Sequence, residues 1–427
     1  MVGQGIWKPL ICITILIGLL SGALPGQAGS RVLLPDLLAE SRLRIQTLTT
    51  YENERWEEAS SMDSHASTDW AKAVNVSEGG PDVASPALAT TSDGTVHLVW
   101  EQNNRIYYSF LQDTEHEIWS TPQAVATGER PDIAAGKDGT LFLVFANQFG
   151  GTYNIYCVRR NGNTWGLPRN VSKTSGISYA PRVAVAPDGS PHVVWSDNTP
   201  GYHVIYHGYH NGKYWVNEPI PNARGVLPTL AFGVDGTMHV AWQDRIALTN
   251  FYNVYYAKWD QYSWTLPVNV SVTNGAHSIV PDILVATDGT VHLVWEEEIT
   301  RTEYHIFYSL QLPEGGWSVP VQVSEEGSDA RGPRLALSYG HYLHLIWQQG
   351  SYLKYRQRSG PAGVWEELNN VAYNDQGLEN AVLSTDPDNN LHAAWAGWLG
   401  TGIRNIFYSR RGPAEPLQQW FPLISGG

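Results

Sequence analysis

The chain has 427 residues, 42% of them hydrophobic and 16% charged, and its formal net charge is −14. A chain of this size can bury a large core, and an acidic surface without a basic block argues against nucleic acid and anionic membrane as partners. Eighteen tryptophans and 22 tyrosines against nine phenylalanines favour pleated strands over helical bundles.

The N-terminus has the pattern of an export signal. An apolar run from Leu10 to Leu20 is followed by small residues and a cleavage site after Ala28. The run is short for a membrane span, so we expect a secreted or cell-surface protein that meets a membrane only if residues 1–28 stay uncleaved. Cleavage removes Cys12 and leaves Cys157 as the single thiol, so no intrachain disulfide is expected.

One sequence unit then recurs seven times. Its pattern is P-x-[hydrophobic]-A-x-x-x-D-G-T-x-H-[LV]-x-W, with the proline and the last aromatic 14 residues apart. Each copy predicts two short strands around a turn, and in five copies this turn is Asp-Gly, whose central residues both tolerate positive φ. In the last two copies the turn degrades to SYGHY (338–342) and DPDNN (386–390). The copies are Pro86–Trp100, Pro131–Phe145, Pro181–Trp195, Pro228–Trp242, Pro281–Trp295, Pro333–Trp347 and Ala381–Trp395.

Two further strands follow each hairpin. The third strands are expected at 106–109, 155–158, 205–208, 254–257, 306–309, 353–356 and 406–409. The fourth strands begin at Trp119, Trp165, Trp215, Trp264, Trp317 and Trp365. Seven antiparallel four-stranded units predict an all-β fold, a seven-bladed β-propeller, because one unit alone cannot bury both of its faces.

The two ends of the chain are predicted to close the ring together. A fourth-strand sequence, WAKAVNVS at residues 70–77, precedes the first copy, whereas the segment from Trp420 lacks the usual valine. We therefore predict that residues 70–77 complete blade seven beside three C-terminal strands, which removes open sheet edges. The propeller then spans residues 70–427, after a signal peptide (1–28) and an N-terminal extension and linker (29–69).

The repeats resemble the bacterial neuraminidase repeats (BNR) of sialidase-like propellers, over about residues 70–427. The resemblance implies a secreted propeller, and its sialidases use three arginines, a tyrosine nucleophile with a glutamate partner, and an aspartate acid. Arg182 and Arg334 are candidates for two of those arginines. The chain departs from sialidases in two ways: SDGTVHLVW does not match their S-x-D-x-G-x-x-W box, and their catalytic propeller has six blades.

Residues repeated in every blade are assigned to the scaffold. Histidines that recur once per blade cannot converge on one site, so we interpret them as neutral, hydrogen-bonded imidazoles between blades. Phe142 takes this position in the second copy, and Cys157 takes a third-strand tyrosine position as a packed thiol. We expect no metal and no cofactor. The histidines are His97, His192, His239, His292, His344 and His392.

Function is expected where the copies differ, on the rim around the mouth of the central channel. The loops between strands two and three share this rim with the connections into the next blade, and the Asp-Gly turns lie opposite. One predicted ring follows the first residue of each unit: Ala87, Asp132, Arg182, Thr229, Asp282, Arg334 and Val382. A second ring follows the aromatic of strand two, and loops add further residues: Glu101, Asp197, Asp244, Glu296, Glu297, Arg130, Arg224, Tyr179, His277 and Arg331.

Carboxylates, arginines and aromatic faces together suit carbohydrate, through bidentate hydrogen bonds and ring stacking. We therefore predict a monomer whose channel-mouth face binds a carbohydrate or glycoprotein without catalysis. The predicted ligand contacts are Arg182, Arg334, Arg130, Glu101, Asp197, Asp244 and Glu297.

Three alternatives stay open. The first is a glycan-cleaving enzyme, either a sialidase-like exo-hydrolase or a polysaccharide lyase, with Asp132, Asp282 and Glu296 as catalytic candidates. This alternative requires Asp132, Asp282, Arg182 and Arg334 to lie within a few ångströms of one pocket. The second is a cell-surface scaffold for protein interactions, and the third is a solvated acidic face held by ion pairs.

Overall fold

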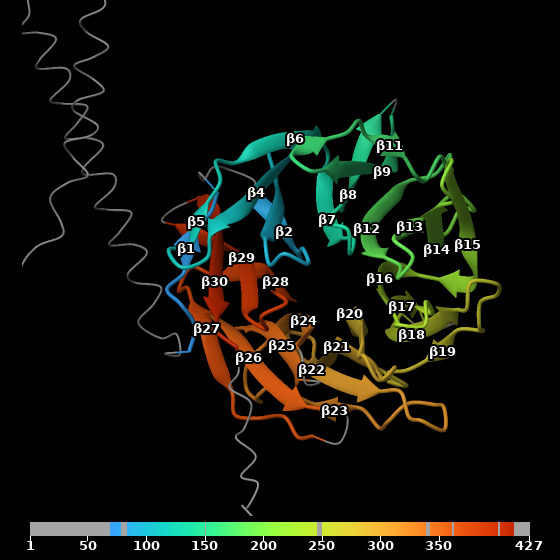
Figure 1. The fold of residues 1–427 in the computed structure, drawn as a ribbon. Helices are drawn as coiled ribbons and strands as arrows, with labels where there is room; N and C mark the ends of the chain where they lie inside the picture. Colours follow the sequence, from blue (N-terminus) through green and yellow to red (C-terminus); the bar gives the residue numbers. More distant parts are fainter. Residues whose placement is uncertain are drawn as a thin grey trace, which may run out of the picture. The chain divides into compact units, whose positions relative to one another are not determined.

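The computed structural model describes residues 69–77, 83–149, 151–245, 250–338, 342–360, 363–399 and 402–413. Within these ranges all regular elements are strands, grouped into seven antiparallel sheets. The sheets are arranged in a ring around a central axis, each with one strand innermost (Figure 1). The predicted all-β, seven-bladed propeller is therefore confirmed. The predicted signal peptide, nearly all of the predicted extension and linker, and the segment from Trp420 lie outside the described residues.

Each blade runs from an inner to an outer strand, and the bounds for blades one to four are as follows. Blade one has β2 (Val83–Thr90), β3 (Val96–Gln102), β4 (Arg105–Asp113), β5 (Ile118–Trp119) and β6 (Gln123–Thr127). Blade two has β7 (Glu129–Ala135), β8 (Leu141–Phe149), β9 (Thr152–Asn161), β10 (Thr164–Trp165) and β11 (Arg169–Asn170). Blade three has β12 (Ser178–Val185), β13 (Pro191–Asp197), β14 (Val204–His210) and β15 (Trp215–Arg224). Blade four has β16 (Val226–Phe232), β17 (Met238–Arg245), β18 (Tyr252–Trp259) and β19 (Val268–Asn269).

The remaining three blades follow the same order. Blade five has β20 (Ser278–Val285), β21 (Val291–Thr300), β22 (Glu303–Leu310) and β23 (Val321–Gln322). Blade six has β24 (Ala330–Ser338), β25 (Tyr342–Gln349), β26 (Tyr352–Ser359) and β27 (Asn369–Tyr373). Blade seven has β28 (Leu378–Thr385), β29 (Leu391–Leu399), β30 (Ile403–Arg411) and β1 (Val74–Asn75). Several outer strands are short or split, since a proline follows their tryptophan by three residues and cannot donate to the ladder.

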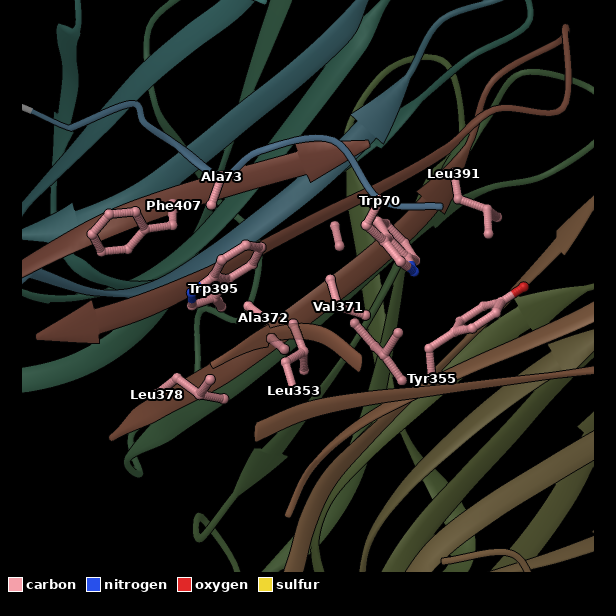
Figure 2. Close-up of a cluster of buried hydrophobic side chains, with 13 residues drawn as sticks. Trp70, Ala73, Leu353, Tyr355, Val371, Ala372, Leu378, Leu391, Trp395 and Phe407 are labelled. Carbon is pink, nitrogen blue, oxygen red and sulfur yellow. The ribbon is translucent and has the colours of Figure 1, made fainter. Parts of the chain in front are cut away.

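The predicted closure of the ring is confirmed. β1 pairs with β30, with Val74 opposite Tyr408, and Trp70 forms an isolated bridge to Arg411. The Trp70 ring also meets Tyr355 of blade six at a centroid distance of 5.6 Å (Figure 2). The two ends of the propeller are thus joined by backbone pairing and by a shared hydrophobic cluster.

The Asp-Gly turns differ from the two-residue turns that the sequence predicts. In blade one, Gly94 has a φ of 84°, but Asp93 does not have a positive φ. The Gly94 N–H donates to the Thr91 carbonyl, and the Asp93 carboxylate accepts the Thr95 N–H at 3.0 Å. The aspartate therefore stabilises a longer turn through its side chain, and only the glycine needs the left-handed conformation.

The six recurring histidines are scaffold residues, as predicted, although their main partners lie in the same blade. In five blades Nδ1 lies 2.7–2.9 Å from a tyrosine hydroxyl of the third strand, as for His97 and Tyr108. In blade three the partner is His207, at 2.9 Å. In blade two both members of the pair are replaced: Phe142 takes the place of the histidine and Cys157 the place of the tyrosine. Burial lowers the pKa of His97, His192, His239 and His292 to about 4, which keeps these imidazoles neutral.

The blades contact one another through these same tyrosines. A fourth-strand tryptophan of the next blade packs edge-on against the tyrosine ring, as Trp165 does against Tyr108 at 5.1 Å. The same contact recurs at four other interfaces, and the Trp70–Tyr355 contact is one of them. Each interface is thus a layer of aromatic rings, which explains the excess of tryptophan and tyrosine.

A β-bulge interrupts every inner strand just before the recurring proline position. The residue ahead of that position has a φ between 50° and 62°, and the register with the second strand shifts there by one residue. A bulge re-aims the side chains that follow it. The residues with positive φ are Ser85, Arg130, Ala180, Leu227, Val280, Gly332 and Asn380.

Candidate functional site

The inner-strand residues after the bulge include two aspartates and two arginines that interact with one another. Arg182 Nη1 lies 3.5 Å from Asp132 Oδ1. Burial lowers the pKa of Arg334, and the charge of Arg182 adds to this effect, while Asp282 and Asp132 act in the opposite direction. The four side chains therefore share one electrostatic environment, and their place in a ring at the channel mouth stays a prediction.

Both aspartates are held by the backbone of the next blade. Asp132 Oδ2 accepts the Val183 N–H at 2.8 Å, and Asp282 Oδ2 accepts the Leu335 N–H at 2.8 Å. Asp282 also accepts the Thr229 hydroxyl at 3.3 Å. Burial raises the pKa of Asp132, and the charge of Arg182 opposes this rise. Each carboxylate thus bonds its own inter-blade neighbour, which favours a scaffold role for both.

Two glutamates of the second ring bind the bulge of the next blade. Glu101 Oε2 accepts the Arg130 N–H at 3.0 Å, and Glu296 Oε1 accepts the Gly332 N–H at 2.8 Å. Gln243 of blade four makes the equivalent bond to the Val280 N–H of blade five, at 2.9 Å. Burial raises the pKa of both glutamates. A neutral amide performs the same task, so this position does not require a charge.

Two other acidic residues of the second ring accept the indole N–H of the core tryptophan. Trp295 donates to Glu297 at 2.9 Å, and Trp195 donates to Asp197 at 3.4 Å. Asp197 is fully buried and also accepts the Ser178 hydroxyl at 2.7 Å. Such carboxylates are engaged inside the blade and are poorly placed to contact a ligand.

Asp244 breaks this pattern. Its carboxylate accepts the neighbouring Arg245 N–H, and the Trp242 indole N–H has no partner among the described residues. Burial raises the pKa of Asp244 to about 6, and the charge of Arg224 opposes this rise. Asp244 is therefore a partly exposed carboxyl that can exchange a proton near neutral pH.

A cluster of aromatic and basic residues lies on the rim of blades two and three, and we call it the rim cluster. It consists of Arg130, Tyr179, Tyr202, His203 and Arg224. The Tyr179 and His203 rings meet edge-on at 5.6 Å, and the Arg224 guanidinium lies 4.7 Å from the centre of the Tyr202 ring. Burial raises the pKa of Tyr179, while a hydrogen bond with Ser196 and the charge of Arg130 lower it. The cluster therefore combines two cations with three aromatic rings at a partly exposed surface.

The sequence predicts three members of the rim cluster as rim residues, Arg130, Tyr179 and Arg224. It does not predict Tyr202 and His203. Both lie in the loop between β13 and β14, which is longer than the two-residue loop Asn103–Asn104 of blade one. This difference in loop length was visible in the repeats. His277, another predicted rim residue, lies between Phe251 and Tyr252 at ring distances of 5.3 and 5.6 Å.

Two other rim arginines are engaged in ion pairs. Arg331 contacts Asp329 at 2.9 Å and Glu296 at 3.1 Å, and its guanidinium covers the Tyr304 ring. Arg404 pairs with Glu379. In the described part of the chain, neither Arg130 nor Arg224 forms an ion pair, which is also true of Arg105 and Arg334. Arg130 and Arg224 are distinguished by their aromatic neighbours, since Arg130 acts on Tyr179 and Arg224 lies over the Tyr202 ring.

Among the described residues, no group of three histidine, cysteine, aspartate or glutamate side chains is arranged to hold a metal ion. The same residues contain no helix long and apolar enough to cross a membrane.

The comparisons with known proteins identify the fold. No family model and no curated protein matches the sequence. An ulvan lyase of polysaccharide lyase family PL25 is similar in structure, with a TM-score of 0.60 and 9% identity over 78% of this chain and 94% of that one. A structure of this lyase bound to -[GlcA(1-4)Rha3S]- is also similar, with a TM-score of 0.58 and 9% identity over the same shares of the two chains. An α-L-arabinofuranosidase from Fusarium graminearum has a TM-score of 0.50 and 13% identity, over 81% of this chain and 98% of that one. At these identities the likeness shows the propeller fold, and membership of the BNR family stays a prediction.

Proposed function

We propose that this propeller binds an acidic polysaccharide on its channel-mouth face, at the rim cluster. The observation that supports this most is the pair of guanidinium groups, Arg130 and Arg224, that form no ion pair among the described residues and lie beside Tyr179, Tyr202 and His203. Guanidinium groups bind carboxylates and sulfates in bidentate fashion, and aromatic faces stack on sugar rings.

The charge of the whole chain favours a localised site. With a net charge of −14, most of the surface repels an anionic polymer, so attraction is confined to places where cations are not already paired. The ulvan lyase of similar fold was solved with an oligosaccharide that contains glucuronate and a sulfated rhamnose. That ligand has the acidic chemistry that the rim cluster suits.

Cleavage of the bound chain by β-elimination is a second candidate, and the contact between Tyr179 and His203 favours it. An arginine beside a uronate carboxylate acidifies the adjacent C–H, and the His203 imidazole is exposed enough to take that proton. The electrons of the C–H bond form a C=C bond while the glycosidic C–O bond breaks. The Tyr179 hydroxyl then supplies a proton to the leaving oxygen, so no water is consumed.

Binding to polygalacturonate and to its carboxyl-reduced, neutral form tests the proposal. We expect the double variant Arg130→Ala with Arg224→Ala to bind the acidic polymer at least tenfold more weakly than the native chain in calorimetry, equal to about 1.4 kcal/mol, and to show no change with the neutral form. Arg105→Ala, an exposed arginine of the same rim outside the cluster, is the matched control and should bind normally. Equal binding of the acidic polymer by the native chain and the double variant would refute the proposal.

The second candidate has its own measurement. β-Elimination creates an unsaturated uronate that absorbs in the ultraviolet, and Tyr179→Phe should abolish this signal while it preserves binding. Binding without any product rejects cleavage and leaves the binding proposal intact.

A further inference from the structure

A groove of about 1280 Å³ opens on the face that carries the Asp-Gly turns, opposite the channel mouth. It crosses blades two, three and four and passes the turn of blade three at Asp188 and Gly189. Its volume exceeds the roughly 300–1,000 Å³ of small-molecule sites, which suits an extended ligand. The rim cluster lies at the other end of the strands, so the groove is a separate feature.

The groove lies where the repeat loses its interface tyrosine twice in succession. Five blades place a third-strand tyrosine against the histidine of strand two. Blade two has Cys157 there instead, and blade three has His207. Both side chains are smaller than tyrosine, so the aromatic layer is thinner at two neighbouring interfaces. Cys157 and Phe142, the altered pair of blade two, both line the groove.

The residues that pack over these two interfaces also differ from those at the other interfaces. At three other interfaces an arginine from the third strand of the next blade lies over the tyrosine, as Arg160 lies 5.0 Å from the centre of the Tyr108 ring. The strand register places His210 at this position in blade three and Trp259 in blade four. Trp259 meets the His207 ring at 5.2 Å, and His210 meets Trp215 at 5.6 Å. Aromatic rings thus replace a cation where the tyrosine is missing, and they line the groove.

The edges of the groove present hydrogen-bond acceptors. The turn carboxylates of Asp138, Asp188 and Asp235 line it, and bonds to neighbouring serine or threonine groups lower their pKa values. These three anions outnumber the two lining cations, Arg159 and Arg169. Ionised carboxylates accept hydrogen bonds from hydroxyl groups and repel anions. The groove therefore suits a ligand that is rich in hydroxyls and uncharged.

We propose that this groove is a second carbohydrate site, which binds a neutral oligosaccharide with Trp215, Trp259 and His210 as stacking rings and the turn aspartates as hydroxyl acceptors. It does not depend on the rim cluster, because the two sites differ in face and in the charge of their ligand. A polymer with both acidic and neutral segments can engage both sites at once, which raises its apparent affinity.

A variant that restores the repeated histidine–tyrosine pair in blade two tests this site with little risk to the fold. The double variant Phe142→His with Cys157→Tyr rebuilds the pair that five other blades contain, so it should fold, and the new phenol ring occupies part of the groove. Calorimetry with cellohexaose, xylohexaose and mannohexaose measures neutral binding, with hexagalacturonate as the acidic probe. We expect at least one neutral hexasaccharide to bind with a stoichiometry of one, and the double variant to bind it at least tenfold more weakly.

Two further variants make the result decisive. Leu167→Glu changes a groove residue whose side chain is 78% exposed, so it cannot unfold the protein, and it should weaken neutral binding several-fold. Arg130→Ala with Arg224→Ala should leave neutral binding unchanged, which separates this site from the rim cluster. The proposal is overturned if no neutral hexasaccharide binds the native chain, or if the groove variants bind as tightly as the native chain.

Discussion

Buried histidines without a charged partner have one consequence for stability. His97 and its equivalents share a hydrogen bond with a tyrosine, or with His207 in the case of His192, and are desolvated, so protonation is unfavourable in the folded state. Burial lowers the pKa of four of them to about 4 and that of His344 to about 3. An unfolded histidine has a pKa near 6.5.

We therefore expect the propeller to be acid-labile below about pH 6.5. Between pH 6.5 and about 4 the unfolded chain binds protons that the folded chain does not, so the free energy of unfolding falls as the pH falls. Each histidine contributes on the order of 3 kcal/mol across this range. Asp244, with a raised pKa of about 6, acts in the opposite direction, as do Asp132, Glu101 and Glu296, whose pKa values burial also raises. The measurement is the thermal midpoint from pH 8 to 4, which should be nearly constant above pH 7 and then decrease steeply.

Two variants separate the effect of the buried histidines on acid stability from the effect of an exposed histidine. His292→Phe with Tyr308→Cys copies the pair of blade two and should shift the acid transition to lower pH. His116→Phe, whose imidazole is 65% exposed, should leave the transition in place. A midpoint independent of pH between 7 and 4.5 would contradict this account.

At the scale of the strand, the bulges of blades two, four, five and six each donate a backbone N–H to an acceptor side chain of the preceding blade. Glu296 supplies it to Gly332 and also pairs with Arg331, whereas Gln243 supplies it to Val280. The bulge leaves a backbone N–H outside the regular ladder, and a buried N–H without a partner costs about 1–3 kcal/mol. An acceptor side chain after the core aromatic is thus a structural requirement in these blades.

Substitution of Glu296 tests this role. Glu296→Ala should lower the free energy of unfolding by about 2–4 kcal/mol, because it leaves the Gly332 N–H and one Arg331 contact without an acceptor. Glu296→Gln keeps an acceptor oxygen, as Gln243 does, and should cost less than half as much. Urea denaturation measures both. Equal losses for the two variants would show that charge, and not the backbone hydrogen bond, is what matters.

At the scale of the whole molecule, one short segment closes the ring. Trp70 makes the aromatic contact with blade six that Trp317 makes with blade four, so the N-terminal segment contributes both a strand and an interface. Without this closure, β30 would be an open edge.

Trp70→Ala should therefore destabilise the propeller by about 3–5 kcal/mol. Trp317→Ala, which removes the same kind of contact inside a continuous blade, is the comparison. The control is Tyr262→Ala, since this ring is 93% exposed and should have no effect. We expect limited proteolysis to cut Trp70→Ala within residues 69–77 more readily than the other variants. If Trp70→Ala is as stable as Tyr262→Ala, β1 does not hold the ring closed.

The fold, the number of blades and the closing strand were all predictable from the sequence. These features follow from local patterns: alternating hydrophobic residues, Asp-Gly turns and tryptophans at a constant spacing within each unit. Repetition inside the chain also identified the recurring histidines as scaffold residues, because a residue needed once per blade serves the blade. The repeat pattern did not predict the geometry of the turns, since Asp93 acts through its side chain and not through positive φ.

The variable residues that are available to a ligand could be identified from the three-dimensional structure and not from the repeats. Asp132 and Glu101 differ between blades in sequence, yet each bonds a backbone N–H of the following blade, which lies tens of residues away along the chain. The Tyr179–His203 contact joins an inner strand to a loop, and the groove beside Cys157 arises from three neighbouring blades. The physical reason is that hydrogen-bond satisfaction and side-chain volume depend on neighbours in space, and a repeat pattern specifies positions without specifying those neighbours.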